Sequence, residues 1–173
     1  MDKDDFKATA SERSLDSVQL VASMLLCFPE LSKVRFMADL SGVKLFFNLP
    51  PDMDSYEVSS KLVNIEESLK LYCELEGIKN ARPMGAVAEN GATLYIDLEC
   101  LTRGSISLVV ELMREYFGEK LLCEAAPEAD AELVGMQMDL IDPRIDFLRD
   151  NRAEESLVGI REGGKVMVFA TEI

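Results

Sequence analysis

Hydrophobic and polar positions alternate most clearly in residues 83–122. Apolar and polar side chains take turns over 92–99, as in a strand with one buried face. Asn90-Gly91 just before it supplies the turn of a tight hairpin, which makes 84–88 the incoming strand. The apolar spacing then changes to three and four residues, which predicts an amphipathic helix that ends at Gly118.

The hydrophobic spacing of two earlier stretches also predicts helices and a hairpin. Apolar residues at spacings of three and four predict a helix from Ser14 to the residue before Pro29. Residues 34–49 alternate on either side of Ser41-Gly42, which predicts another hairpin. Asp54 then begins a second amphipathic helix as its N-cap.

The two hairpins and their following helices form a weak internal repeat. Residues 42–49 match residues 91–98, and each segment precedes an amphipathic helix. Any two hairpin-helix units share such a binary pattern, so duplication and simple patterning explain the match equally well.

The last fifty residues carry weaker signals. The segment 124–142 holds six carboxylates and no basic residue, which predicts a linker or loop in its first part. Alternation over 134–140 predicts a strand. Asp142-Pro143 predicts the start of a short helix, and Glu162-Gly163-Gly164 the turn of a third hairpin.

This order of elements predicts an α+β fold. We expect an antiparallel sheet built from β-hairpins with amphipathic helices packed on one face, in the order α-ββα-ββα and then a C-terminal helix and hairpin. The expected divisions are a disordered tail (1–13), an α+β core domain (14–123), an acidic linker or loop (124–133) and a C-terminal extension packing on the same domain (134–173).

Composition narrows the classes of partner. The chain has 32 acidic and 18 basic residues, and a net charge of −14 repels phosphate backbones and anionic lipid headgroups. We therefore expect no nucleic acid and no membrane partner. The acidic first five residues do not resemble a signal peptide, and the longest apolar run, 18–28, is too short to span a bilayer. A cytoplasmic protein is the expectation.

The cysteines and the lack of histidine narrow the chemistry. The four cysteines are widely separated and sit among apolar residues, which favours reduced core thiols. No histidine is available for a Ser-His or Cys-His nucleophile, for acid–base work or for metal ligation. We predict no catalytic residue, no metal site and no cofactor.

Two motifs offer alternatives. Residues 159–165 have the GxxxxGK spacing of a phosphate-binding loop, but Val166 replaces the Ser or Thr and a hairpin turn explains the glycines. Asp139, Asp142, Asp146 and Asp150 share a helical spacing that would suit a divalent cation or a carboxylate enzyme, whereas interleaved arginines favour a salt-bridged surface. A small-molecule sensor is the remaining alternative.

Four residues are the candidates for partner binding. In the repeat, Phe46 and Tyr95 occupy the same position, on the strand face that also carries Lys44 and Asp97. Two aromatic rings on an otherwise polar sheet face indicate a surface covered by a partner, a second subunit or the third hairpin.

The element order resembles the type III secretion chaperone-like fold and the bacterial sensory-transduction-regulator proteins that share it. The resemblance covers 14–123 and is strongest over 84–122, with the Glu89-Asn90-Gly91 turn, the Leu-Tyr-Ile-Asp-Leu strand and the apolar helix. It implies a non-catalytic, dimeric protein that binds protein segments. The roadblock and longin-like regulatory domains have a similar element order. We therefore expect a regulatory or chaperone-like, self-associating protein-binding domain.

Overall fold

The computed structural model describes residues 10–39, 42–124, 130–153 and 155–171. The helices are α1 (Ala10–Cys27), α2 (Ser55–Leu75), α3 (Arg103–Phe117), α4 (Ala131–Asp139) and α5 (Ile141–Asp150), with a 3-10 turn, η1 (Gly118–Lys120), after α3. The strands are β1 (Lys33–Met37), β2 (Gly42–Asn48), β3 (Met84–Ala88), β4 (Gly91–Asp97), β5 (Ser156–Glu162) and β6 (Lys165–Thr171).

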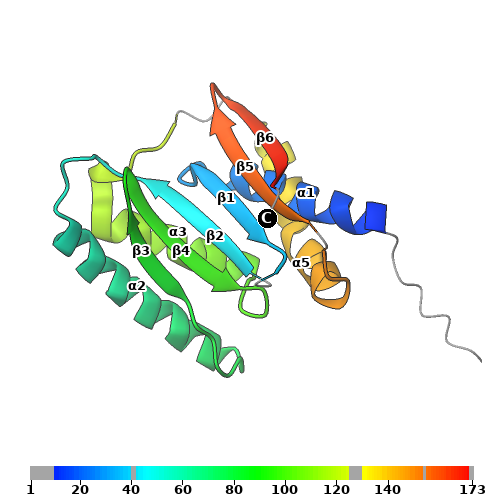
Figure 1. Cartoon of the computed structure of the whole chain (residues 1–173), viewed down its shortest axis with the longest axis horizontal. Coiled ribbons are helices and arrows are strands. Elements are labelled where there is room, and N and C mark those ends of the chain that lie inside the picture. The colour runs from blue at the N-terminus through cyan, green and yellow to red at the C-terminus, as the bar shows by residue number, and fades with distance from the viewer. Residues whose placement is uncertain (1–9, 40–41, 125–129, 154, 172–173) are drawn as a thin grey trace, which may run out of the picture.

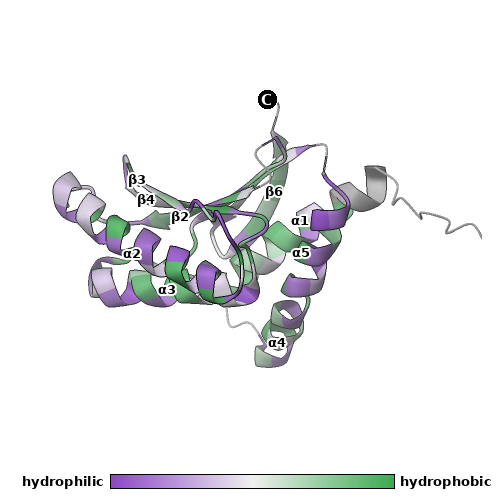
Figure 2. Cartoon of the chain, turned by 90° about the horizontal axis from the view of Figure 1, so that it is seen from below, coloured by the Kyte–Doolittle hydropathy of each residue, from purple (hydrophilic) through white to green (hydrophobic). Residues whose placement is uncertain are grey.

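The strands form one six-stranded antiparallel sheet in the order β3-β4-β2-β1-β5-β6 (Figure 1). The helices lie on one side of this sheet, as the edge-on view in Figure 2 shows. The predicted α+β class is therefore confirmed. Because β5 pairs with β1, the third hairpin extends the sheet and does not fold over its other face.

The middle of the sheet has approximate two-fold symmetry. Leu45 of β2 pairs with Leu94 of β4, and both side chains are buried on the helix side. Around this central pair, Lys44 lies opposite Tyr95 and Phe46 opposite Thr93. The two repeat segments thus pair with each other, and α2 and α3 pack together beneath them.

The helix ends agree with local sequence signals. The Asp54 side chain accepts a hydrogen bond of 3.0 Å from the Tyr56 amide at the start of α2. Thr102 and Ser105 exchange hydrogen bonds as a capping box at the start of α3. Gly118 caps the other end of α3, as predicted.

The C-terminal part joins the core through α1. This helix packs on α4 and α5 and runs under β1, β5 and β6. At Gly159 of β5 the helix comes so close that an added Cβ would overlap the Val21 and Leu25 side chains. Only glycine permits this contact between helix and sheet.

Three polar side chains bind the helices of this C-terminal part together. The Ser23 hydroxyl of α1 donates to the Gln137 side chain of α4 at 2.7 Å and accepts from Arg144 of α5 at 2.6 Å. Ser23 is fully buried, so these partners satisfy a hydroxyl that would otherwise be costly to bury.

The prediction of a strand over residues 134–140 is wrong, because the helix α4 occupies this stretch. The Asp130 side chain accepts from the Glu132 amide and starts the helix. Val134 and Met138, which are four residues apart, are the side chains that pack against the core. The apolar alternation was therefore coincidental, and the spacing of four residues reflects the helix face that packs against the core.

Two predicted boundaries also move. The first helix begins at Ala10 and not at Ser14, so residues 10–13 are not part of a tail. The predicted linker 124–133 overlaps the start of α4, while residues 125–129, like residues 1–9, lie outside the described part of the chain.

The prediction of four reduced core thiols is also wrong. Cys73 at the end of α2 and Cys100 after β4 form a disulfide with a Cα–Cα distance of 6.1 Å. Cys27 is a buried thiol, and burial raises its pKa, whereas Cys123 is exposed. Sequence spacing could not reveal the Cys73–Cys100 pair, because β3 and β4 separate the two cysteines along the chain.

No helix among the described residues combines the length and hydrophobicity that a membrane crossing requires.

The disulfide should contribute measurably to stability. It closes a loop with a sequence separation of 27, and chain-entropy arguments give about 3.6 kcal/mol for a loop of this size. We expect a reducing agent, or the double variant Cys73→Ala/Cys100→Ala, to lower the urea midpoint accordingly.

The exposed Cys123 gives a matched control, since Cys123→Ala should leave the midpoint unchanged. Alkylation of the unfolded, unreduced protein should modify two thiols, and modification of four would contradict the disulfide.

Candidate functional site

The sheet face opposite the helices is the candidate site. We call it the open face, and strand register places its side chains in two rows that cross all six strands. The first row consists of Met84, Tyr95, Lys44, Arg35, Val158 and Phe169. The second row consists of Ala86, Thr93, Phe46, Lys33, Ile160 and Met167.

Charge is distributed unevenly along these rows. Their cations, Lys33, Arg35 and Lys44, lie on the central strands β1 and β2. Apolar and aromatic side chains flank them toward both edges of the sheet. Although the chain has 32 acidic residues, neither described row contains an Asp or Glu. The open face therefore has a basic centre on a strongly acidic protein.

The rings at the centre are held in place by their neighbours. The Lys33 ammonium lies 4.8 Å from the centroid of the Phe46 ring, within the range of a cation–π contact. The Phe46 side chain is half-buried by this contact and by the adjacent strands. Phe46 thus offers a ring face that is already positioned before a partner arrives.

Tyr95 is fixed at two points. Its ring lies over Gly42, where a Cβ would overlap it, and its hydroxyl donates to Asp97 Oδ1 at 3.0 Å. Burial raises the pKa of Tyr95 to about 12, with further contributions from the hydrogen bond to Asp97 and from the charges of Asp97 and Asp39. The phenol is therefore neutral, and acts as a donor, at every physiological pH.

The structure gives Asp97 a supporting position. One carboxylate oxygen accepts from the Tyr95 hydroxyl, and the other accepts from the Arg82 amide at 3.2 Å. Both oxygens are thus engaged within the chain. Of the four predicted partner-binding residues, Phe46, Tyr95 and Lys44 lie in the two rows, and Asp97 anchors Tyr95 at their edge.

Sequence reasoning missed half of the open face. Lys33 and Arg35 lie on it through the β1–β2 pairing, while Val158 and Phe169 join it only because β5 pairs with β1. Phe169 is 51% exposed and Met84, at the opposite edge, is 64% exposed. Residues 166–169 are apolar on both faces, a pattern that predicts a central or covered strand, whereas β6 is an edge strand of the sheet.

The alternative motifs have structural explanations. The phosphate-loop spacing falls on the β5–β6 turn, where Gly163 and Gly164 have positive φ angles and a strand follows. Asp139 pairs with Arg103 at 3.2 Å, and Asp146 with Arg149 at 3.0 Å. Within the described residues no three carboxylate or cysteine side chains converge as metal ligands would.

Comparisons with known proteins give no further guide: no protein-family model, no curated protein and no solved structure matches the chain.

The raised pKa of Tyr95 predicts a specific response to alkali. Since the folded pKa is about 12 and an unfolded phenol titrates near ~10, the contribution of Tyr95 to stability is complete below pH ~10 and is lost as pH rises toward 12. We expect the urea midpoint to fall between these values by more in the wild type than in Tyr95→Phe.

Absorbance at the phenolate wavelength provides the direct measurement. The wild type should contain a phenol with a pKa of about 12 that is missing in Tyr95→Phe. In Asp97→Asn this pKa should fall but stay above the ordinary value, because burial is its largest cause. Identical titration curves for wild type and Tyr95→Phe would contradict the assignment.

Proposed function

We propose that this protein is a non-catalytic protein-binding domain whose open face docks an acidic, partly apolar segment of another protein. The observation that carries the proposal is the composition of the two rows, with three central cations, flanking apolar side chains and no carboxylate. A partner of this chemistry would bury the apolar flanks and pair its carboxylates with the central cations.

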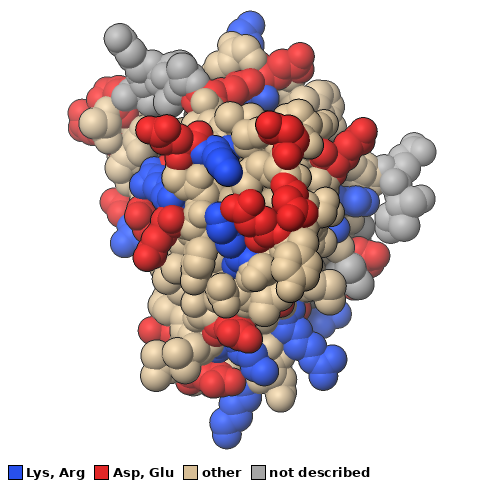
Figure 3. Space-filling model, turned by 90° about the vertical axis from the view of Figure 1, so that its left-hand side faces the viewer, with Lys and Arg blue, Asp and Glu red and all other residues tan. Residues whose placement is uncertain are grey.

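The contrast with the remaining surface supports an acidic partner. Carboxylates are spread over the α2 and β3 side of the molecule in Figure 3. A net charge of −14 repels an acidic segment from most of the protein, whereas the basic centre attracts it locally. Electrostatics would therefore direct such a partner to the open face.

The same charges disfavour the self-association that the sequence suggested. A second copy stacked face to face about a two-fold axis at the sheet centre would oppose Lys33, Arg35 and Lys44 to their own equivalents. Like charges in contact cost several kcal/mol, on the order of the gain from the apolar flanks. A heterologous partner fits the face better than a second copy.

The shape of the sheet suits an elongated segment. In Figure 2 both edges of the sheet turn away from the helices, so the open face lies on the inner side of the curve of the sheet. The two rows run across the strands and would present successive contacts to a segment lying across this face. Binding of protein segments is also what the resemblance to chaperone-like and regulatory domains implies.

A crosslinking experiment tests the proposed face. A photoreactive phenylalanine analogue would be placed at position 46 on the open face, and in a separate variant at the exposed position 63 on α2. We expect position 46 to capture a protein through a segment rich in acidic and apolar residues, and position 63 not to capture it.

Titration with the purified partner then measures how much single side chains contribute to the binding free energy. Phe46→Ala should weaken binding by about 1–3 kcal/mol and change the unfolding midpoint little, because the ring is only half-buried. A fully buried ring would instead cost about 3–5 kcal/mol of stability. Lys44→Glu should weaken binding at least as much, whereas the control Lys70→Glu, on the exposed surface of α2, should not.

Two results would contradict the proposal. Capture at position 46 of only a second copy of the chain, together with a dimer by light scattering, would identify self-association. Equal weakening by Lys44→Glu and Lys70→Glu would show that overall charge, and not the open face, determines binding.

A further inference from the structure

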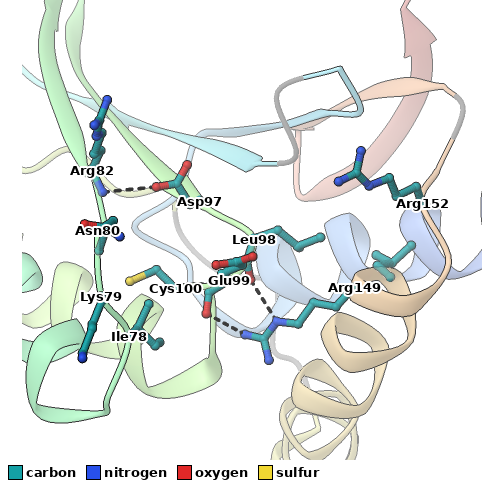
Figure 4. A pocket seen from close by; sticks show the side chains of 12 residues that line it. Ile78, Lys79, Asn80, Arg82, Asp97, Leu98, Glu99, Cys100, Arg149 and Arg152 are labelled. Atoms are coloured by element: carbon teal, nitrogen blue, oxygen red, sulfur yellow. Dashed lines mark hydrogen bonds between the residues drawn. The ribbon is translucent and has the colours of Figure 1, made fainter.

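Asp97, which fixes the Tyr95 hydroxyl, also lines a cavity of about 500 Å³. Three segments distant in sequence form it, namely the α2–β3 loop (78–82), the end of β4 with the following turn (97–100), and the end of α5 with the two residues after it (148–152). Figure 4 shows the 97–100 segment between the loop and α5. Its volume falls in the range of small-molecule sites, about 300–1,000 Å³.

The three walls are fixed to one another. The Arg149 guanidinium of α5 donates to the carbonyls of Leu98, Glu99 and Leu101 at 3.1, 3.2 and 2.7 Å. These bonds join α5 to the 97–100 segment. The cavity is therefore closed on this side by contacts that need no ligand.

The opposite wall is held by a covalent bond. The Cys73–Cys100 disulfide ties the end of α2, from which the 78–82 loop leaves, to the 97–100 segment. The Arg82 amide adds a hydrogen bond to Asp97. A site with walls held in this way is preformed, which lowers the entropy cost of binding.

The charges around the cavity are opposite to the charge of the protein. Lys79 and Arg82 lie on the loop side, and Arg149 and Arg152 on the α5 side. Figure 4 shows the Arg152 side chain extending from the residues after α5 toward the side of the view on which Asp97 lies. Arg149 is already engaged by three carbonyls and by Asp146, and Asp97 by two hydrogen bonds, so three lining cations stand against one lining carboxylate, Glu99. On a protein with a net charge of −14, this local excess of positive charge favours an anion.

Apart from Asn80, the remaining lining is apolar. Ile78, Ala81, Leu98 and Leu148 contribute to the cavity, and the last three are buried. Most small-molecule sites combine an apolar lining with a few polar groups that orient the ligand. Inorganic phosphate would leave this apolar lining uncovered, so an organic anion fits better.

We propose that this cavity binds a small organic anion through carboxylate or phosphate groups, independently of the open face. The anionic groups pair with Arg82 and Arg152 on the two sides, and the carbon skeleton covers the apolar lining. This ligand class is the chemistry shared by carboxylate and phosphate metabolites, and the experiment separates the two.

Calorimetric titration with defined probes tests the proposal. Citrate represents the carboxylates, adenosine monophosphate the phosphates, and uncharged adenosine is the control for the phosphate probe. We expect one-to-one binding of at least one anion with a Kd of about 1 mM or lower, and at least tenfold weaker binding of adenosine than of its monophosphate if the latter binds.

Variants assign the binding to the cavity. Arg82→Gln and Arg152→Gln remove one cation from each side, and each should weaken the bound anion by about tenfold. Lys70→Gln removes one exposed cation outside the cavity and should have no such effect. Unchanged thermal midpoints in the apo variants would show that the losses are not due to unfolding.

Three outcomes would overturn the proposal. The first is no saturable binding of either anion up to about 10 mM, where even a Kd of ~1 mM would be detected. The second is tighter binding of adenosine than of its monophosphate. The third is an equal loss in Lys70→Gln and in the cavity variants.

Discussion

The pairing of β1 on both of its edges is the constraint on which the structure depends. This strand of five residues joins β2 on one side and β5 on the other, so it connects the two repeated hairpin-helix units to the C-terminal part of the chain. Val34 and Phe36 point into the core from it, and Lys33 and Arg35 point to the open face. Without the β1–β5 pairing, the sheet would end at β1, and α1 would lack the strands β5 and β6 that it packs against.

Local periodicity was sufficient to predict most elements but not their assembly. The three hairpins and the helices α2 and α3 are recovered because their patterns are strong and their turns contain Gly, Asn or Pro. The order of the strands was not predictable, since β1 and β5 come from opposite ends of the chain and no local signal joins them. The error over residues 134–140 has the same origin, because packing of α4 on α1 outweighed a short alternation.

The candidate site also has a part that the sequence could predict and a part that it could not. Phe46 and Tyr95 could be placed on one face because the repeat puts them at equivalent positions of adjacent strands. The basic centre of that face combines Lys44 with Lys33 and Arg35 within the β1–β2 hairpin, whereas its apolar half on β5 and β6 could not be foreseen, because no local signal pairs β5 with β1. The cavity could not be predicted from the sequence at all, because each of its walls comes from a different part of the chain and Cys73 meets Cys100 only after folding.

Asp97 is the point at which the two proposed sites meet. Its Oδ1 fixes Tyr95 on the open face, and its Oδ2 holds the Arg82 amide at the rim of the cavity. A single carboxylate thus stabilises an aromatic contact on one side and a loop on the other, and it can do both because a carboxylate has acceptor sites on each oxygen. Asp97 therefore links the position of the ring over Gly42 to that of the 78–82 loop through two hydrogen bonds, one at each oxygen.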